Sequence, residues 1–298
     1  MIIAIAGGTG FVGKALIHQL IENKHEVRVL TRKVKPPVPG VTWVSWLNKG
    51  DQPEKELEGI HAFINLAGES INAGRWSNER KERLLSSRIE ATKECLRIIH
   101  NLNEKPKVFI NASAVEAERV TEDNKPLLGF KGMDFLATVT HRLEQEASKA
   151  VMLGIRTVYA RFGIVLGSQE GALSRMVLPY RMFVGGKVGS GNQWVSWIHI
   201  ADVVGLLLFA IEKHEIRGPL RITSPHPVTM DEFGKTIGNV LHRPHWIPVP
   251  PFALKLALGE MSLLVLDGSY VLPEKALAMG YTFRYPHLED ALKDILFL

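Results

Sequence analysis

The chain has 298 residues, of which 46% are hydrophobic and 22% charged, and its formal net charge is +5 at pH 7. This length suits one large domain or a domain with a smaller annex, and the composition argues against disorder. No stretch offers the roughly 18 uninterrupted apolar residues that a membrane span needs, so we expect no membrane partner. The first apolar run has no secretory signal before it, which predicts a cytoplasmic protein.

The distribution of charge and the number of cysteines limit the classes of ligand and partner that we expect. Lysine and arginine are dispersed along the chain instead of forming an arm or stripe, so we expect an anionic small-molecule substrate and no nucleic acid. Cys95 is the only cysteine, which excludes a disulfide framework and a thiolate metal site. Its helical, apolar surroundings predict an inert core thiol. No cluster of histidine and carboxylate has metal-ligand spacing, so no metal is expected.

Strand and helix patterns alternate through the first half of the chain. Residues 2–6 form a continuously apolar run, which is typical of a strand covered on both faces. Apolar residues then recur at helical spacing, and a strand pattern resumes at 27–31, which completes one βαβ unit. Further strands are predicted at 41–46, 62–67, 108–112 and 155–161, and long helices near 78–101 and 133–153. This alternation predicts an α/β fold with a Rossmann-type, doubly wound parallel sheet.

The turn between the first strand and the first helix is rich in glycine and reads Gly7-Gly8-Thr9-Gly10-Phe11-Val12-Gly13. Gly7 can form a tight turn, Gly10 lets the backbone approach a pyrophosphate, and Gly13 allows the helix to pack closely on the strand. The start of the helix offers unpaired N–H groups and a partial positive charge to phosphates. The βαβ setting therefore favours a dinucleotide site over a turn that binds nothing.

The residues after the second strand bear on the choice of cofactor. An NAD site usually has a carboxylate there, which accepts a hydrogen bond from the ribose 2′-hydroxyl. This chain has Arg32 and Lys33 instead. A guanidinium can bind the 2′-phosphate of NADP, whereas a carboxylate would repel it. We therefore predict NADP in preference to NAD; the alternative is that Arg32 is a solvated loop charge.

Beyond residue 163 the pattern changes, because glycines and prolines interrupt shorter helical segments. We predict an NADP-binding domain of residues 1–163 and a smaller substrate-side subdomain of residues 164–298, with late segments able to return to the main sheet. The glycine-rich stretch 185–191 lacks a strand-to-helix setting. It is either a flexible loop that covers the substrate or a plain surface connector.

Several motifs together resemble those of the extended short-chain dehydrogenase/reductases. They are the glycine turn, Asn65-Leu66-Ala67-Gly68, Ser113 after a strand, and the run that begins at Arg161. Arg75-Trp76, Ser87-Arg88 and residues 197–202 are similar to an "epimerase family" branch, which is linked to NAD-dependent epimerases/dehydratases and nucleotide-sugar epimerases.

The resemblance implies roles for three parts of the chain. Residues 65–68 would line the cofactor, and Arg161 would join its contacts. Ser113 would lie near the nicotinamide as the catalytic hydroxyl that hydrogen-bonds a substrate carbonyl. From the residues alone, Asn65 and Ser113 could instead be polar strand ends that satisfy their own backbone.

The usual catalytic pair of this superfamily is missing. Extended members use Tyr-x-x-x-Lys, in which the tyrosine transfers a proton while hydride moves to or from the nicotinamide. If Glu144 marks the acidic residue that follows the pair, the two places fall on Leu136 and Thr140, which we expect to be helix packing residues.

Other side chains are candidates for the missing roles. The possible replacement acids or bases are Glu69, Glu116, His141 and His199. For His199 we prefer a strand-end role, with Asp202 capping a helix that starts near residue 203. Arg75, Trp76 and Arg88 could clamp an anionic or ring-bearing substrate, or be solvated and packed.

Two hypotheses follow. The first is an NADP-dependent epimerase or oxidoreductase that acts on a small, nucleotide-sugar-like substrate, with Ser113 polarising a carbonyl. The second is an NADP-binding protein that has lost catalysis and reports NADP status to a partner, which the missing tyrosine supports. Nucleic-acid binding is not supported, because the basic residues of the sequence form no cluster.

Overall fold

The computed structural model describes residues 1–33, 35–71, 74–115, 134–168 and 170–297. Seven parallel strands form one sheet in the order β10-β6-β5-β4-β1-β2-β3. These strands are β1 (Ile2–Ala6), β2 (Glu26–Thr31), β3 (Val41–Ser45), β4 (Ala62–Asn65), β5 (Val108–Ala114), β6 (Arg156–Phe162) and β10 (Gly218–Ile222). The predicted α/β fold with a doubly wound parallel sheet is confirmed.

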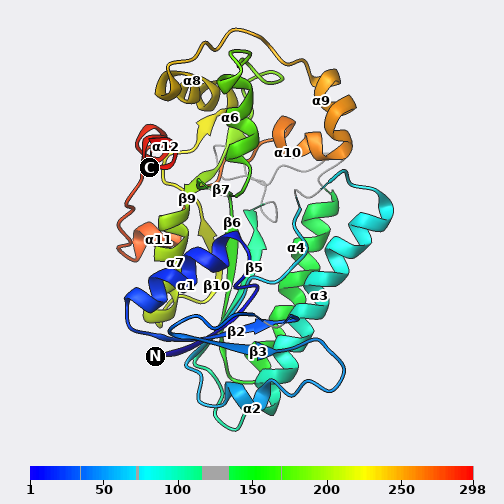
Figure 1. The fold of residues 1–298 in the computed structure, drawn as a ribbon, viewed down its shortest axis with the longest axis vertical. Coiled ribbons are helices and arrows are strands. Elements are labelled where there is room, and N and C mark those ends of the chain that lie inside the picture. Colours follow the sequence, from blue (N-terminus) through cyan, green and yellow to red (C-terminus); the bar gives the residue numbers. More distant parts are fainter. Residues whose placement is uncertain (34, 72–73, 116–133, 169, 298) are drawn as a thin grey trace.

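Helices cover both faces of this sheet (Figure 1). The helices on one face are α1 (Phe11–Glu22) and α7 (Ile200–Glu212), with α11 (Glu274–Ala278) beside β10. The helices on the other face are α2 (Glu54–Leu57), α3 (Asn78–Asn101), α4 (Asp134–Ala147) and α5 (Lys149–Met152). The helix expected near 133–153 is therefore two helices, separated at Ser148.

Strand side chains alternate between the two layers, as a pleated sheet requires. In β1, Ile3 and Ile5 belong to the core beneath α1 and α7, whereas Ala4 belongs to the core beneath α3. Cys95 lies in the second core with no exposed surface, and this burial raises the pKa of its thiol well above the ordinary value. The predicted core position of this cysteine is confirmed, and a buried thiol with a raised pKa is expected to be inert.

A third core holds together most of the chain beyond residue 163. Its largest buried side chains are Trp197 and Phe233. The remaining helices are α6 (Leu173–Arg181), α8 (Met230–Leu241), α9 (Pro251–Leu258), α10 (Leu263–Leu266), α12 (Leu288–Phe297) and the 3-10 turn η2 (Gly259–Ser262). The short strands pair as β7 (Ile164–Leu166) with β9 (Trp197–His199) and β8 (Trp194–Val195) with β11 (Val228–Thr229).

The late segments divide between the two regions. The strand β10 pairs with β6 at the edge of the main sheet, and α7 packs on that sheet, whereas α6, α8 and α12 form the third core. Within the described part of the chain, no helix has both the length and the apolarity of a membrane span.

Candidate cofactor and active site

The glycine turn follows β1 at the carboxyl end of the sheet. Gly7 has φ +80°, and a Cβ there would lie 2.5 Å from the carbonyl carbon of Leu66, so only glycine fits. A Cβ on Gly13 would lie 2.5 Å from the Gly7 oxygen, which means that α1 packs directly on the turn. A Cβ on Gly10 would meet no atom closer than the Gly7 oxygen at 3.4 Å, an ordinary contact distance. The space in front of Gly10 is therefore open to a ligand.

The first turn of α1 faces this open space. Gly10 is the N-cap and gives no side-chain cap, and no acidic residue stands in the first turn. The first amides of α1, from Phe11 and Val12, therefore keep the unpaired donors and partial positive charge of a helix N-terminus. Thr9 and Gly10 are exposed, whereas the ring of Phe11 packs against Gly167.

Arg32 and Lys33 lie beside this turn. Ala6 of β1 pairs with Leu30 of β2, so the residues that follow the two strands share one edge of the sheet. Both cations are exposed, and Lys33 is held by backbone hydrogen bonds with the Thr31 hydroxyl at 3.0 and 3.3 Å. The arrangement places positive charge next to the glycine turn.

The Asn65 side chain belongs to a buried network beneath the loop that follows β4. Its amide nitrogen donates to the Oδ1 of Asn111 at 2.7 Å and to the hydroxyl of Thr92 at 3.1 Å, and its oxygen accepts from the Ala67 amide. Asn65 therefore shapes the loop through its side chain. The backbone of Leu66, against which Gly7 packs, is held to β1 by its own amide.

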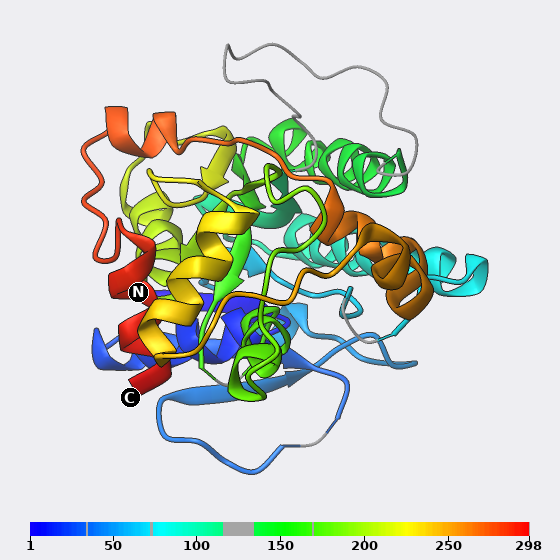
Figure 2. The same ribbon diagram turned by 90° about the horizontal axis from the view of Figure 1, so that it is seen from above.

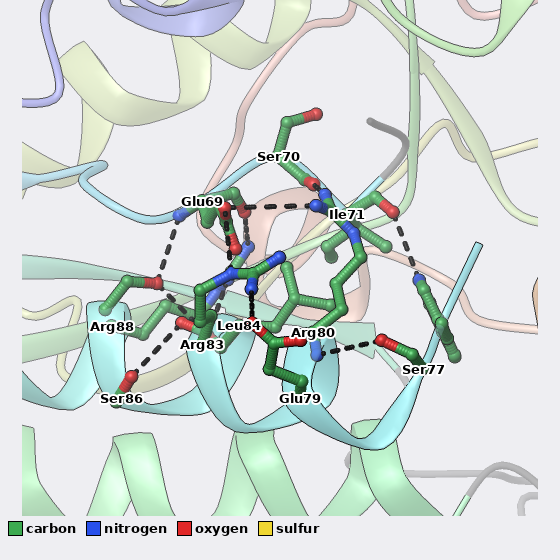
Figure 3. A network of polar contacts seen from close by, with 12 residues as sticks. Glu69, Ser70, Ile71, Ser77, Glu79, Arg80, Arg83, Leu84, Ser86 and Arg88 are labelled. Atoms are coloured by element: carbon green, nitrogen blue, oxygen red, sulfur yellow. Dashed lines mark hydrogen bonds and ion pairs between the residues drawn. The ribbon is translucent and has the colours of Figure 1, made fainter. Parts of the chain in front are cut away.

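Glu69 of this loop lies against the first turns of α3 (Figure 3). A Cβ on Gly68 would lie 2.9 Å from the Cγ of Arg88, whose guanidinium donates to the carbonyl oxygens of Leu84 and Glu69 at 2.8 and 2.9 Å. Burial lowers the pKa of Arg88. This guanidinium holds the loop in place, which is a structural role.

The carboxylate of Glu69 is surrounded by cations. Its Oε1 lies 3.9 Å from Arg80 and 3.7 Å from Arg83 (Figure 3). The Glu69 amide donates to the hydroxyl of Ser87. These two guanidiniums hold the Glu69 side chain against α3.

Ser113, Glu144 and Arg161 meet at the carboxyl ends of β5 and β6. Ser113 pairs with Arg161 in the sheet register. The Ser113 hydroxyl donates to Glu144 Oε1 at 2.7 Å, and Arg161 binds both oxygens of the same carboxylate at 2.7 Å. The side chains of Arg161 and Glu144 are only 8% and 14% exposed. This buried triad contains two predicted site residues, Ser113 and Arg161, and adds Glu144 between them.

In the sequence, Glu144 marks only the place of the missing Tyr-x-x-x-Lys pair, and its contact with Ser113 and Arg161 was not predicted. Its role depends on α4 lying across β5 and β6. This packing brings Glu144 to Ser113, 31 positions earlier in the chain, and to Arg161, 17 positions later. The available signal was an acidic residue facing inward on an amphipathic helix, because a buried carboxylate needs a partner.

Leu136 and Thr140 pack within the helix layer, as predicted. Leu136 is buried with Trp76, Leu84 and Met261, and the Thr140 hydroxyl donates to the Leu136 carbonyl oxygen at 2.8 Å. Of the proposed replacement acids and bases, His141 is exposed on α4, and Glu116 lies outside the described residues.

His199 lies in the C-terminal region, and the expectation for its neighbour Asp202 was wrong. The cap of α7 is His199 itself, whose Nδ1 accepts from the Ala201 amide, and the helix begins at residue 200. Asp202 is buried and instead accepts hydrogen bonds from the amides of Arg284 and Tyr285 at 2.7 and 2.8 Å. It anchors the C-terminal tail.

The proposed Arg75 and Trp76 clamp is not assembled as one surface. The Trp76 ring is buried edge-on against Phe135, and its Nε1 donates to the carbonyl oxygen of Ile71. Arg75 donates to the carbonyl oxygen of Leu256 at 2.7 Å. The two residues join the loop after β4 to the helix layer and to the end of α9.

Comparison with known proteins places the chain among epimerase-like proteins. The model of the NAD dependent epimerase/dehydratase family matches residues 3–222, and a domain of unknown function, DUF1731, matches residues 249–295. The epimerase family protein YfhF of Bacillus subtilis is 46% identical over 99% of this chain and 98% of its own.

Two solved structures extend this likeness. The human epimerase family protein SDR39U1, solved with NADPH, is 32% identical with a TM-score of 0.84 over 99% of both chains. A nucleoside-diphosphate sugar epimerase of Corynebacterium glutamicum is 28% identical with a TM-score of 0.77, over 99% of this chain and 58% of that longer one. The sheet order, the glycine turn and these matches show that this chain belongs to the NAD dependent epimerase/dehydratase family.

Proposed function

We propose that this protein is an NADP-dependent epimerase or oxidoreductase that acts on a small, anionic, nucleotide-sugar-like substrate. The observation that carries the proposal is the uncapped start of α1 behind an open Gly10, with Arg32 and Lys33 on the same sheet edge. The human relative solved with NADPH and the bacterial sugar epimerase support the cofactor and the substrate class.

The chain's own groups fit such a cofactor. The amides of Phe11 and Val12 would bind the pyrophosphate, because they are donors at the positive end of a helix. Arg32 and Lys33 would bind the 2′-phosphate through charge-assisted hydrogen bonds. When bound, the nicotinamide supplies the acceptor or donor of hydride.

The triad of Ser113, Glu144 and Arg161 would transfer a proton between the substrate and the protein. Because the Ser113 hydroxyl already donates to Glu144, its oxygen presents lone pairs to a substrate hydroxyl. The substrate proton passes to Ser113 as the serine proton passes to Glu144 Oε1, and in the reverse direction Glu144 returns its proton to Ser113 as Ser113 donates its own to the substrate carbonyl. Arg161 holds the carboxylate in position for both directions. This relay would replace the tyrosine that the sequence lacks.

Turnover of a panel of nucleotide sugars with NADP or NADPH tests the enzyme. Ser113→Ala should reduce the rate by about 100-fold or more, the usual contribution of a positioned proton-transfer group. Ser86→Ala removes an exposed hydroxyl on α3 and should leave the rate unchanged. Turnover that persists in Ser113→Ala would remove Ser113 from the mechanism.

Cofactor choice has a separate test. Titration of wild type and Arg32→Asp with NADP and NAD should show that the substitution weakens NADP binding by roughly 10-fold to 100-fold, since a charge-assisted hydrogen bond contributes about 1.5–3 kcal/mol. Lys107→Asp changes an exposed charge that precedes β5, at the opposite edge of the sheet, and serves as the control. A wild-type preference for NAD would contradict the assignment.

A second candidate is a protein that binds NADP without catalysis and signals to a partner. The burial of Leu136 and Thr140 favours it, because neither of the usual catalytic places faces a substrate. A pull-down with and without NADP tests this function. A partner retained only with the nucleotide, together with no turnover on any substrate, would select the sensor over the enzyme.

A further inference from the structure

An apolar surface lies at one end of the molecule, remote from the sheet. Of the fifteen large hydrophobic side chains that are exposed in the described part of the chain, eight lie in residues 178–184 and 246–256. Six of these lie at the end of α6, in the residues just after it and in the connection from α8 to α9, and we call them the α6-end patch: Leu178, Met182, Phe183, Val184, Trp246 and Ile247. Figures 1 and 2 show α6 and this connection at the end of the long axis, with no other element in front of them.

The two sides of α6 differ in what covers them. Leu173, Val177 and Tyr180 point into the third core and are buried. On the opposite side, Leu178 and Met182 are 55% and 63% exposed. An amphipathic helix normally turns polar residues to solvent, so an apolar outer face indicates an interaction surface.

The aromatic residues of the patch are held outward by a fixed backbone. Trp246 is 66% exposed, yet its Nε1 donates to the Phe183 carbonyl oxygen and its amide donates to Gly185. A Cβ on Gly186 would lie 2.0 Å from the Ile247 oxygen, so the two backbones are in direct contact. The stretch 185–191 is thus tied to the α8–α9 connection, and the patch is pre-organised.

The chain segments that carry this patch have no acidic residue within them. Residues 171–201 and 233–259 contain no aspartate or glutamate. Their cations are Arg175, Arg181, Lys187, Lys235, Arg243 and Lys255, of which Lys235 is paired with Asp231. Arg243 lies 4.3 Å from the centre of the Phe183 ring, within the patch itself. Asp231, at the start of α8, is already paired with Lys235 and His245.

We propose that the α6-end patch is a docking surface for an anionic phospholipid bilayer. Two copies of this chain meeting through the patch would each bring Arg181 and Arg243 into the interface with no carboxylate of the patch to pair with them, which opposes self-association. Tryptophan and phenylalanine flanked by arginine and lysine match a bilayer interface, where rings enter the headgroup layer and cations meet lipid phosphates. The lack of a spanning segment led us to expect no membrane partner, but peripheral contact needs none.

The test measures co-sedimentation of the full-length protein with vesicles of phosphatidylcholine alone or mixed with phosphatidylglycerol. We expect binding only to the anionic vesicles, weakening as salt is raised. Phe183→Asn should reduce binding about 10-fold or more, as the loss of a buried aromatic side chain implies. Asparagine suits the φ of +63° at this position, and the carbonyl oxygen that Trp246 binds is kept, so the loop should still fold.

Two further variants test the positive charge beside the patch and the place of the patch on the molecule. Arg181→Glu should weaken binding to anionic vesicles at least about fivefold, because one cation near such a surface contributes about 1 kcal/mol. Met152→Ser removes an apolar side chain that is 87% exposed on α5, and binding should not change.

Several results would overturn the proposal. They are equal binding to neutral and anionic vesicles, no binding to either, and Phe183→Asn binding as wild type does. A wild-type dimer that Phe183→Asn converts to monomer in analytical ultracentrifugation would assign the patch to a second copy instead.

Discussion

The ion pair between Glu144 and Arg161 gives a sharp prediction for stability. Glu144→Gln keeps the size of the side chain and removes its charge, so the buried Arg161 guanidinium loses its two-bond ion pair with this carboxylate. With side chains only 14% and 8% exposed, solvent screens the loss poorly. Breaking such a buried pair costs about 3 kcal/mol. For a chain of this size that corresponds to a fall in melting temperature of roughly 6–12 °C.

Differential scanning calorimetry of purified variants measures this fall. Glu289→Gln breaks an exposed pair with Lys293 on α12, and its melting temperature should match that of wild type. Replacing both partners, with Glu144→Leu and Arg161→Met, should recover most of the loss, since both charges of the buried pair are then removed together. A Glu144→Gln melting temperature equal to that of Glu289→Gln would refute the reasoning.

Four further substitutions probe the glycine turn and the C-terminal region. Gly7→Ala should lower the melting temperature, because its Cβ would strike backbone, whereas Gly10→Ala should keep it and weaken NADP binding in a titration. Burial lowers the pKa of His199 below 6.5, so the unfolded chain binds more protons and stability falls as the pH drops below about 6.5. The melting temperature of His199→Asn should not show this fall below about pH 6.5. An equal fall in the variant would assign the pH dependence to other groups. Asp202→Asn sets an amide group against two backbone donors and should cost about 2 kcal/mol in urea unfolding, and a loss near zero would contradict its role as tail anchor.

Local patterns predicted the sheet and its helices well. The expected strand at 2–6 and the helix at 78–101 coincide with β1 and α3, because each has a strong apolar period and clear ends. Ser77, which caps α3, is the residue type that favours a helix start. The helix after residue 133 was less well predicted, since the interruption at Ser148 leaves little mark on the apolar pattern.

The site was harder to predict where contacts join distant parts of the chain. The glycine turn is local, so the need for Gly7 and Gly13 could be inferred from spacing. The partner of Ser113 could not, because Glu144 reaches it only through the packing of α4 on the sheet. Asp202 was misassigned for a related reason: its side chain binds backbone more than 80 positions later in the chain, a contact that no local rule for helix caps contains.

The return of β10 to the main sheet has a consequence for how the protein is made. While a ribosome has delivered only residues 1–163, the edge of β6 has no neighbour and the apolar surface beneath α7 is bare. Unpaired strand edges and bare apolar surface are what drive nascent chains to aggregate. Synthesis must therefore proceed through Ile222 before the first half is covered, which makes this interval the one in which a chaperone has most to protect.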